Sequence, residues 1–393
     1  MRTTFLLAIF LLFLTACVPL RSIQYLVPDS KDSSKFNNVT IQKSATPFRF
    51  KNNYPNSNYT ALKNRVDSSL VGTKTNVFLV IKNDSIIYQY LSEGTSLQAK
   101  QPSFSMAKSF VGTLVGIAVD RGQIKSTNQL VIDYLPQLVN NDERFKKLTI
   151  QHVLDMRSGF RFTERSFNPF SKITRSYYGA DLKRMVSKLK MKNEPGKVFE
   201  YQSINTQVLA MILEKATGKS LEQLFQENLW GPLGTESDAL WSVDNKDNIK
   251  AFCCINATAL DFAKLGRLYL NGGNWEGNQI VSKQWVDATT HPDSLTAKRY
   301  KNQFWACRDF RYFKDSTSAV NQLAKDKMDY RIEKNPDGRY FYAQKVYDYK
   351  AQGMFNQSVY VNPQNKVIIV RLGGRQKKIN FHGFVQEVGR SIK

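Results

Sequence analysis

Two pairs of short apolar runs, one near each end of the chain, constrain the fold most. Residues 77–81 and 86–90 flank a polar segment, and residues 358–361 and 367–370 flank a second one. Runs rich in β-branched residues around polar turns predict β-hairpins. Between them the apolar residues recur mostly with helical spacing. We therefore expect an α/β fold in which both terminal regions build one antiparallel sheet, flanked by helices, with an inserted helical lobe.

The first residues have the pattern of an export signal. Arg2 precedes the apolar run 5–14, which is too short to span a membrane as a helix. The run ends in Leu14-Thr15-Ala16-Cys17, which resembles a bacterial lipobox, so Cys17 is expected to carry lipid after cleavage. An ordinary signal followed by an incidental cysteine is the alternative.

Composition suggests how the rest of the chain is divided. We expect residues 1–16 to be a lipoprotein signal peptide and residues 17–60, rich in Ser, Asn, Lys and Pro, to be a flexible tether. Residues 61–393 would form the folded domain, because 42% apolar residues are enough for a full core. The product would lie in the cell envelope, anchored to a membrane and facing the periplasm or the cell surface.

The remaining cysteines and the histidines indicate neither a disulfide framework nor a metal site. Cys253, Cys254 and Cys307 are odd in number with one adjacent pair. The three histidines stand far apart in the sequence, without the spacing of zinc ligands. We expect no metal and no cofactor.

The net charge of +23 makes nucleic acid the first partner to consider. The export signal and the dispersal of Lys and Arg along the chain argue against it. We expect no nucleic-acid partner, and anionic lipid headgroups or acidic envelope polymers as neighbours.

One short motif can activate a serine without histidine. The pattern predicts a helix from Phe104 to Gly122, and residues three apart on a helix share a face, so Lys108 would lie beside Ser105. The first helical turn also favours developing negative charge, and burial would lower the lysine pKa enough to release a neutral base. A second copy, Ser187 to Lys190, lies in a Lys-rich stretch and is interpreted as an exposed helix.

Longer blocks follow the same motif order as a known family. They comprise residues 103–110, 148–159, 195–201, Glu214 with Thr217 and Gly218, 257–266 and 272–275. Over roughly three hundred residues the sequence resembles the penicillin-binding and serine β-lactamase superfamily, in its class C-like branch. The resemblance implies that Tyr201 is the third catalytic group, which relays protons between Ser105, Lys108 and the leaving group.

Two departures bear on the substrate. Class C β-lactamases usually carry Asn where this chain has Ser203, and the last motif is Ala351-Gln352-Gly353-Met354 instead of Lys-Thr-Gly. Both resemble the branch that contains 6-aminohexanoate-dimer hydrolase and related esterases. This resemblance implies an oxyanion hole formed by the backbone N–H groups of Ser105 and Met354.

The resemblance also implies a lid between the Ser-Gly block and Tyr201, from Tyr177 or Tyr178, with Tyr178 taken as a candidate substrate contact. Residues 309–345 are expected to be an insertion near the last strands. The expected function is hydrolysis of a carboxylic ester, short amide or peptide through an acyl-enzyme on Ser105. The alternatives are a D-amino-acid peptidase, a β-lactamase, and a surface lipoprotein that only binds.

Overall fold

The computed structural model describes residues 28–29, 32–164, 168, 170–179, 181–291, 300–307, 310–313, 315–326, 330–334, 340–344 and 348–392. The expected signal segment 1–16 and Cys17 lie outside this part of the chain. Among the described residues, no helix is long and apolar enough to cross a membrane.

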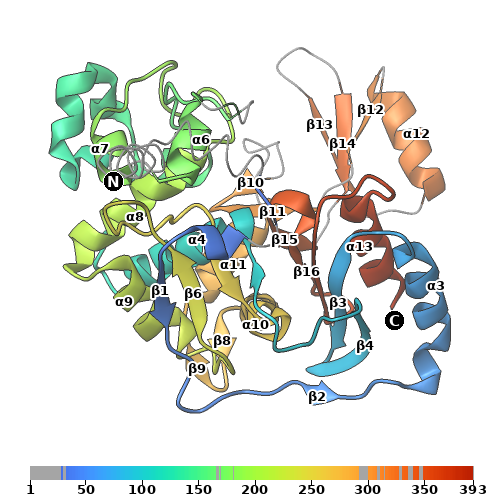
Figure 1. The fold of residues 1–393 in the computed structure, drawn as a ribbon. Coiled ribbons are helices and arrows are strands. Elements are labelled where there is room, and N and C mark those ends of the chain that lie inside the picture. The colour runs from blue at the N-terminus through green and yellow to red at the C-terminus, as the bar shows by residue number, and fades with distance from the viewer. Residues whose placement is uncertain are drawn as a thin grey trace, which may run out of the picture.

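The main sheet unites both ends of the domain, as predicted (Figure 1). Its strand order is β10-β11-β15-β16-β17-β3-β4-β2. Strands β3 (Thr75–Lys82) and β4 (Ser85–Leu91) form the first predicted hairpin, and β16 (Ser358–Asn362) and β17 (Val367–Gly373) form the second. The antiparallel pairing of β17 with β3 joins the two hairpins. The other members are β2 (Lys51–Asn52), β10 (Tyr300–Lys301), β11 (Phe304–Ala306) and β15 (Tyr349–Gln352).

Alternating side chains bury both faces of this sheet. Phe78 and Val80 pack with helices α3 (Thr60–Leu70) and α13 (Phe381–Ser391) on one side. Val77, Leu79 and Ile81 face the larger core on the other side, where α10 (Ala259–Leu270) lies against β16 and β17. Gly266 permits this approach, because a Cβ there would lie 2.9 Å from a methyl group of Val359.

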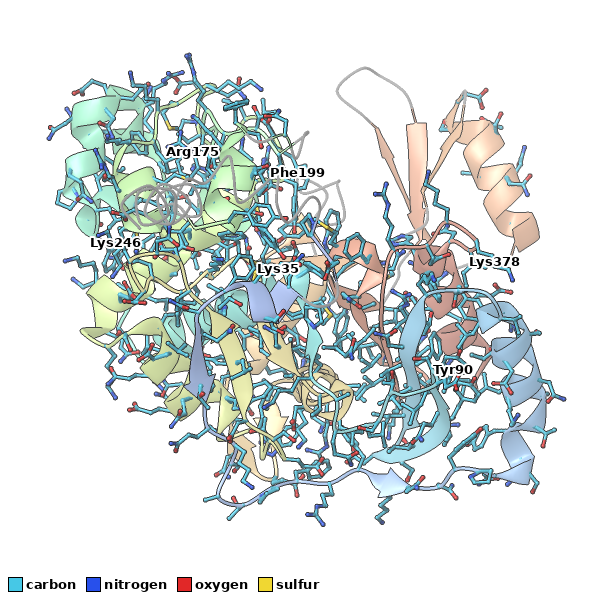
Figure 2. All side chains as sticks on the ribbon, viewed as in Figure 1. Lys35, Tyr90, Arg175, Phe199, Lys246 and Lys378 are labelled. Atoms are coloured by element: carbon cyan, nitrogen blue, oxygen red, sulfur yellow. A yellow bond between two sulfur atoms is a disulfide. The ribbon has the colours of Figure 1, made fainter. Side chains whose placement is uncertain are left out.

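The helical lobe lies beside the sheet, on the side marked by Arg175, whereas Tyr90 marks the sheet (Figures 1 and 2). Its central helix is α4 (Ala107–Asp120), in which every residue from Ala107 to Ala118 is buried. The surrounding helices are α5 (Ile150–Leu154), α6 (Lys172–Tyr177), α7 (Leu182–Ser187), α8 (Ser203–Thr217), α9 (Leu221–Phe225) and α11 (Lys283–Thr290). Short 3-10 turns are η1 (Asp32–Lys35), η2 (Ser57–Tyr59), η3 (Phe104–Met106), η4 (Val131–Asp133), η5 (Pro136–Asn141), η6 (Glu143–Lys147) and η9 (Met354–Asn356), and η7 (Gln226–Trp230) is a π-helical turn.

A second sheet has the strand order β1-β6-β7-β5. Its strands are β1 (Asn38–Ile41), β5 (Gln101–Pro102), β6 (Ala239–Ser242) and β7 (Ile255–Ala257), all antiparallel to their neighbours. Strand β5 leads directly into the segment that contains Ser105.

The prediction of a flexible tether over residues 17–60 is wrong for its later part. Strand β1 pairs with β6, β2 pairs with β4, and Ile41 is fully buried. Backbone hydrogen bonds to distant strands hold much of this segment in place. Such bonds do not require a periodic pattern of apolar side chains, so the sequence contains no sign of these strands. The folded part therefore begins well before residue 61.

The expected insertion at 309–345 contains its own small sheet. Strands β12 (Phe310–Phe313), β13 (Tyr330–Lys334) and β14 (Tyr340–Gln344) pair in the order β12-β14-β13, next to helix α12 (Ser316–Asp326) (Figure 1). A separate two-stranded ribbon, β8 (Asn274–Trp275) with β9 (Asn278–Gln279), follows α10.

Candidate active site

Ser105 lies in η3, the tight turn between β5 and the buried helix α4. Ser103 fixes this turn to β7, because its N–H donates to the Ile255 carbonyl at 2.7 Å and its hydroxyl accepts from the Ile255 N–H at 3.1 Å. Phe104 adopts a left-handed backbone, φ 44°, which costs on the order of 1–3 kcal/mol and is frequent at functional sites. The surrounding hydrogen bonds thus hold Ser105 in a fixed place at the start of α4.

Lys108 reaches Ser105 from the next turn. Its Nζ lies 2.9 Å from Ser105 Oγ and 2.9 Å from the carbonyl oxygen of Phe252. The side chain is only 1% exposed, and this burial lowers the pKa of Lys108 to about 8, although the charge of Glu164 opposes the shift. About one tenth of this amine is therefore neutral at pH 7 and can accept a proton.

Tyr201, just before α8, lies beside both Lys108 and Ser105. The Lys108 Nζ lies 5.1 Å from the centre of its ring, which stacks on Trp305 and meets Tyr300 edge-on. Burial, followed by the charge of Glu164, raises the pKa of Tyr201, and hydrogen bonding with Ser105 partly offsets this. The phenol therefore keeps its proton at neutral pH and is available as a donor.

A cavity of about 420 Å³ opens over these groups. Its wall contains Ser105, Tyr201, Ser203, Gly353 and Met354, so the structure brings together five of the residues singled out in the sequence. The remaining lining residues are Phe104, Glu164, Ile173, Tyr177, Phe252, Cys253, Trp305 and Gln352. The volume lies in the range of small-molecule sites.

The turn after β15 lies beside the nucleophile segment in the wall of this cavity. A Cβ on Gly353 would lie 2.2 Å from the Ser103 carbonyl oxygen and 3.2 Å from the Ser105 nitrogen, so the two backbones touch here. Gln357 braces the turn through paired hydrogen bonds to the backbone of Gly373 at 2.8 and 2.9 Å. Met354 therefore follows a backbone position that lies close to Ser105, where an oxyanion hole would be needed.

The buried guanidinium of Arg371 supports the same turn, because it donates to the Phe355 carbonyl. Phe355 itself has a left-handed backbone and packs edge-on against Phe104 at 5.2 Å. The nucleophile turn and the turn after β15 are thus braced against each other.

Tyr178, the candidate substrate contact, is not among the residues that line the cavity. Its side chain is 1% exposed and packs against Phe36 and Tyr177, away from the cavity lining. Tyr177 lines the cavity instead, and its hydroxyl donates to Asp32. Tyr177 ends α6 and Tyr178 follows it, and sequence alone left the choice between them open.

Glu164 is a site residue that the sequence did not reveal, as are Phe252 and Trp305. Its carboxylate lines the cavity and accepts a hydrogen bond from the Ser203 N–H at the first turn of α8. Burial raises the pKa of Glu164, and the charge of Lys108 opposes the rise. A lone acidic residue in a loop carries no periodic signal, and only its place in the structure identifies it.

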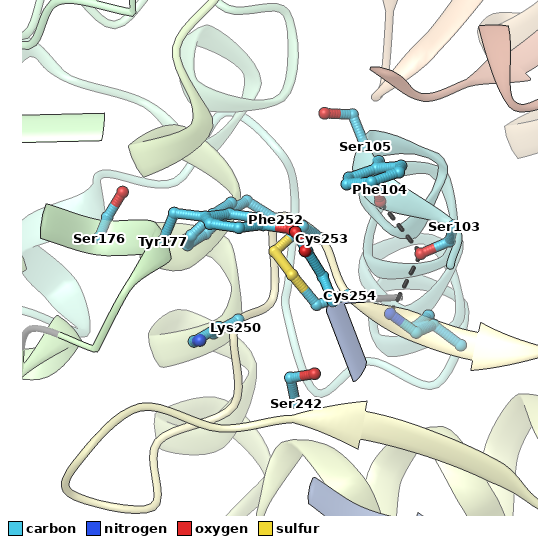
Figure 3. The surroundings of a disulfide bond; sticks show 12 residues. Ser103, Phe104, Ser105, Ser176, Tyr177, Ser242, Lys250, Phe252, Cys253 and Cys254 are labelled. Atoms are coloured by element: carbon cyan, nitrogen blue, oxygen red, sulfur yellow. Dashed lines mark hydrogen bonds between the residues drawn. A yellow bond between two sulfur atoms is a disulfide. The ribbon is translucent and has the colours of Figure 1, made fainter. Parts of the chain in front are cut away.

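The adjacent cysteines are also not as expected. Cys253 and Cys254 form a disulfide with each other (Figure 3), whereas the sequence did not indicate a disulfide framework. Cys307 is buried as a free thiol. The described residues contain no group of three or more His, Cys, Asp or Glu that could hold a metal ion.

The second Ser-x-x-Lys copy has the exposed setting expected for it. Helix α7 ends at Ser187, and Lys190 is exposed beyond it. Its lysine therefore lacks the burial that lowers the pKa of Lys108.

Comparison with known proteins places these features in a common context. The family model described as Beta-lactamase matches residues 77–383. The chain is 30% identical over 234 residues to a 6-aminohexanoate-dimer hydrolase of Paenarthrobacter ureafaciens, an alignment that covers 57% of this chain and 59% of that protein. It is 23% identical over 210 residues to a D-aminopeptidase of Cereibacter sphaeroides, covering 50% of this chain and 38% of the relative.

Among solved structures, a Bacillus anthracis protein described as a 6-aminohexanoate-dimer hydrolase superposes with a TM-score of 0.70 at 20% identity. The superposition covers 92% of each chain. At that identity the likeness concerns the fold. The sequence alignments span less than two thirds of the curated relatives.

Proposed function

Because the chain belongs to the beta-lactamase family, we propose that it is a serine hydrolase that forms an acyl-enzyme on Ser105 and acts on a carboxylic ester, short amide or peptide. The observation that carries the proposal is the buried Lys108 amine, 2.9 Å from Ser105 Oγ. A serine hydroxyl needs an adjacent base to attack a carbonyl. The lowered pKa of Lys108, about 8, supplies that base near neutral pH.

Acylation begins with the neutral Lys108 amine, which accepts the Ser105 proton while Oγ bonds to the substrate carbonyl carbon. The carbonyl oxygen becomes an oxyanion, and the backbone N–H groups of Ser105 and Met354 are proposed to stabilise it. The intermediate collapses as the bond to the alcohol or amine breaks. That leaving group takes a proton from Tyr201, whose phenol is reprotonated from Lys108, and the acyl group stays on Ser105.

Deacylation repeats these steps with water as the nucleophile. Water loses a proton to the Tyr201 and Lys108 pair as its oxygen bonds to the acyl carbon, and Ser105 Oγ leaves with a proton. The carboxylic acid departs and the starting protonation states are restored. Tyr201 suits the relay because its raised pKa keeps the phenol protonated between turnovers.

The chemistry of the cavity wall bears on substrate choice. Among its described lining residues, aromatic and apolar side chains predominate, and Glu164 supplies a carboxylate where no Lys or Arg contributes to the wall. An anionic β-lactam would approach this carboxylate without a cation in the wall to receive it. We therefore propose neutral esters and short amides as better substrates than β-lactams.

Glu164 also supports a second candidate, a peptidase for substrates with a free ammonium group. A carboxylate in the cavity wall would pair with such a group, and the D-aminopeptidase relative makes this class worth testing. Glu164→Gln would then raise KM for an aminoacyl p-nitroanilide much more than for a neutral aryl ester. An equal effect on both substrates argues against the peptidase.

Substrate ranking distinguishes these hydrolases from a β-lactamase. Hydrolysis of p-nitrophenyl acetate and butyrate should be much faster than that of nitrocefin, and a fluorophosphonate probe should label wild-type protein but not Ser105→Ala. The reverse ranking would make the protein a β-lactamase. Failure of the probe and of every ester, amide and peptide tested would leave only a binding module.

We also propose that the protein is a lipid-anchored envelope protein, on the sequence of residues 1–17 alone. Acyl chains contribute about 0.8 kcal/mol per buried methylene, so a multiply acylated Cys17 would hold firmly to a membrane. Cys17→Ala should move the protein to the soluble periplasmic fraction. The membranes must be washed with high salt, because the net charge of +23 attracts anionic lipid by itself. Retention of the variant after that wash contradicts the proposal.

A further inference from the structure

The Cys253–Cys254 disulfide borders the catalytic group directly. Phe252, one residue earlier, gives its carbonyl oxygen to the Lys108 ammonium at 2.9 Å, and the Cys253 side chain lines the cavity beside Phe252. In Figure 3 the Phe252 and Tyr177 rings lie on one side of the disulfide, and the segment that leads to Ser105 lies on the other. Lys108 therefore takes one hydrogen-bond acceptor from the nucleophile and another from the disulfide segment.

The peptide around the disulfide is fixed on its far side. The Cys253 carbonyl accepts from the Trp241 indole at 2.9 Å, and the Cys254 carbonyl accepts from the Ser242 N–H at 3.1 Å. The next residue, Ile255, forms the two hydrogen bonds that hold Ser103. One short segment thus connects to the base through Phe252 and to the nucleophile turn through Ile255.

The backbone of Cys254 needs a constraint to stay as it is. Its φ is 72°, the left-handed region that side chains other than glycine rarely adopt. This conformation costs on the order of 1–2 kcal/mol for an ordinary residue. Closing the two side chains into one ring restricts the rotations of the Cys253–Cys254 peptide and opposes escape from that conformation.

We propose that the Cys253–Cys254 disulfide is a positioning element of the active site: it fixes the Phe252 carbonyl, and through it the amine of Lys108, opposite Ser105. The inference rests on the proposed role of Lys108 as base. Cys253 and Cys254 are positioning residues here, since neither donates to a reacting atom.

This arrangement has a defined effect on proton affinity. A carbonyl acceptor stabilises the charged ammonium, so its loss from a buried site lowers the lysine pKa further. Besides the Ser105 hydroxyl at 2.9 Å, the titratable groups beside the amine are the carboxylate of Glu164, from the loop after α5, and Tyr201, before α8. Both remain when the disulfide is removed, so a change in the titration of Lys108 reports the Phe252 carbonyl.

The test compares the wild type with the double variant Cys253→Ser/Cys254→Ser. The matched control is Cys307→Ser, which removes a buried sulfur from a different hydrophobic cluster. We expect the double variant to lose about tenfold or more of kcat for p-nitrophenyl butyrate, with a small change in KM, and the acidic limb of its kcat profile to move to lower pH. The control should retain the wild-type limb and kcat.

A second readout does not depend on activity. The Nζ resonance of Lys108, assigned in ¹⁵N-lysine protein by its absence from Lys108→Met, should titrate at lower pH in the double variant than in the wild type. An unchanged Lys108 titration, or free thiols at both cysteines in an unreduced peptide map of the wild type, overturns the inference. An inactive wild type whose Lys108 titration still shifts in the double variant would refute the proposed function but not the positioning.

Discussion

The pH dependence of hydrolysis follows from the burial of one amine. A lysine with a pKa near 10.4 is neutral in about 0.04% of molecules at pH 7. Burial lowers the pKa of Lys108 to about 8. About one tenth of the molecules then carry a neutral Lys108 amine at pH 7, roughly 250 times more than with an ordinary lysine. The kcat/KM for p-nitrophenyl butyrate should therefore rise about tenfold per pH unit below pH 8 and level off above it.

Two substitutions test this reasoning. Lys108→Ala should lower kcat/KM by about 10²–10⁴ and abolish the limb near pH 8, because the proton acceptor is gone. Lys190→Ala removes the lysine of the exposed second motif and should leave rate and profile unchanged. Stopped-flow initial rates from pH 5.5 to 9.5, corrected for spontaneous ester hydrolysis, measure both. A wild-type profile that is flat across pH 8, or full activity of Lys108→Ala, refutes the assignment of the base.

Three further predictions concern the surroundings of Lys108. Glu164→Gln removes the charge that raises the pKa of Lys108, so the acidic limb should move to lower pH; a shift to higher pH would contradict this. Gly353→Ala places a methyl 2.2 Å from the Ser103 carbonyl oxygen and should lower kcat about 10²-fold. The matched control is Gly374→Ala, whose methyl would lie at an ordinary 3.4 Å from the Lys74 Cβ and should cause no loss of kcat. Lys108→Met should stabilise the fold by up to about 3 kcal/mol below pH 8, because burying the ammonium is fully unfavourable there. The gain should become progressively smaller between pH 8 and 10.5, where the amine loses its proton. Urea unfolding at pH 7 and pH 10.5 measures the difference, and an equally large gain at both pH values contradicts the prediction.

The sheet and the catalytic helix were predictable because their signals are local. Residues 77–90 and 358–370 contain short apolar runs on either side of polar turns, and the helix from Phe104 has one continuous apolar pattern. Their joining through β17 and β3 followed from the need to cover both hairpins with one core. The order of the motifs resembles that of a known family, and this resemblance identified Tyr201 as the third catalytic residue.

The features that escaped prediction depend on contacts between distant residues. Strands β1 and β2 are short, and pairing with remote strands orders them. Glu164 belongs to the site because its loop brings its carboxylate to the Ser203 N–H at the start of α8. Tyr178 packs against Phe36 instead of lining the cavity. The Cys253–Cys254 pair was visible in the sequence, but an adjacent pair gave no sign that it would close on itself.

Identification of the acylated residue tests the central claim most directly. Wild-type protein mixed with excess p-nitrophenyl acetate and quenched in acid during the steady state should gain the mass of one acetyl group. Peptide mapping should place that group on Ser105, and Ser105→Ala should acquire none. Acetylation of another residue as the turnover intermediate, or steady turnover by Ser105→Ala, would contradict the account.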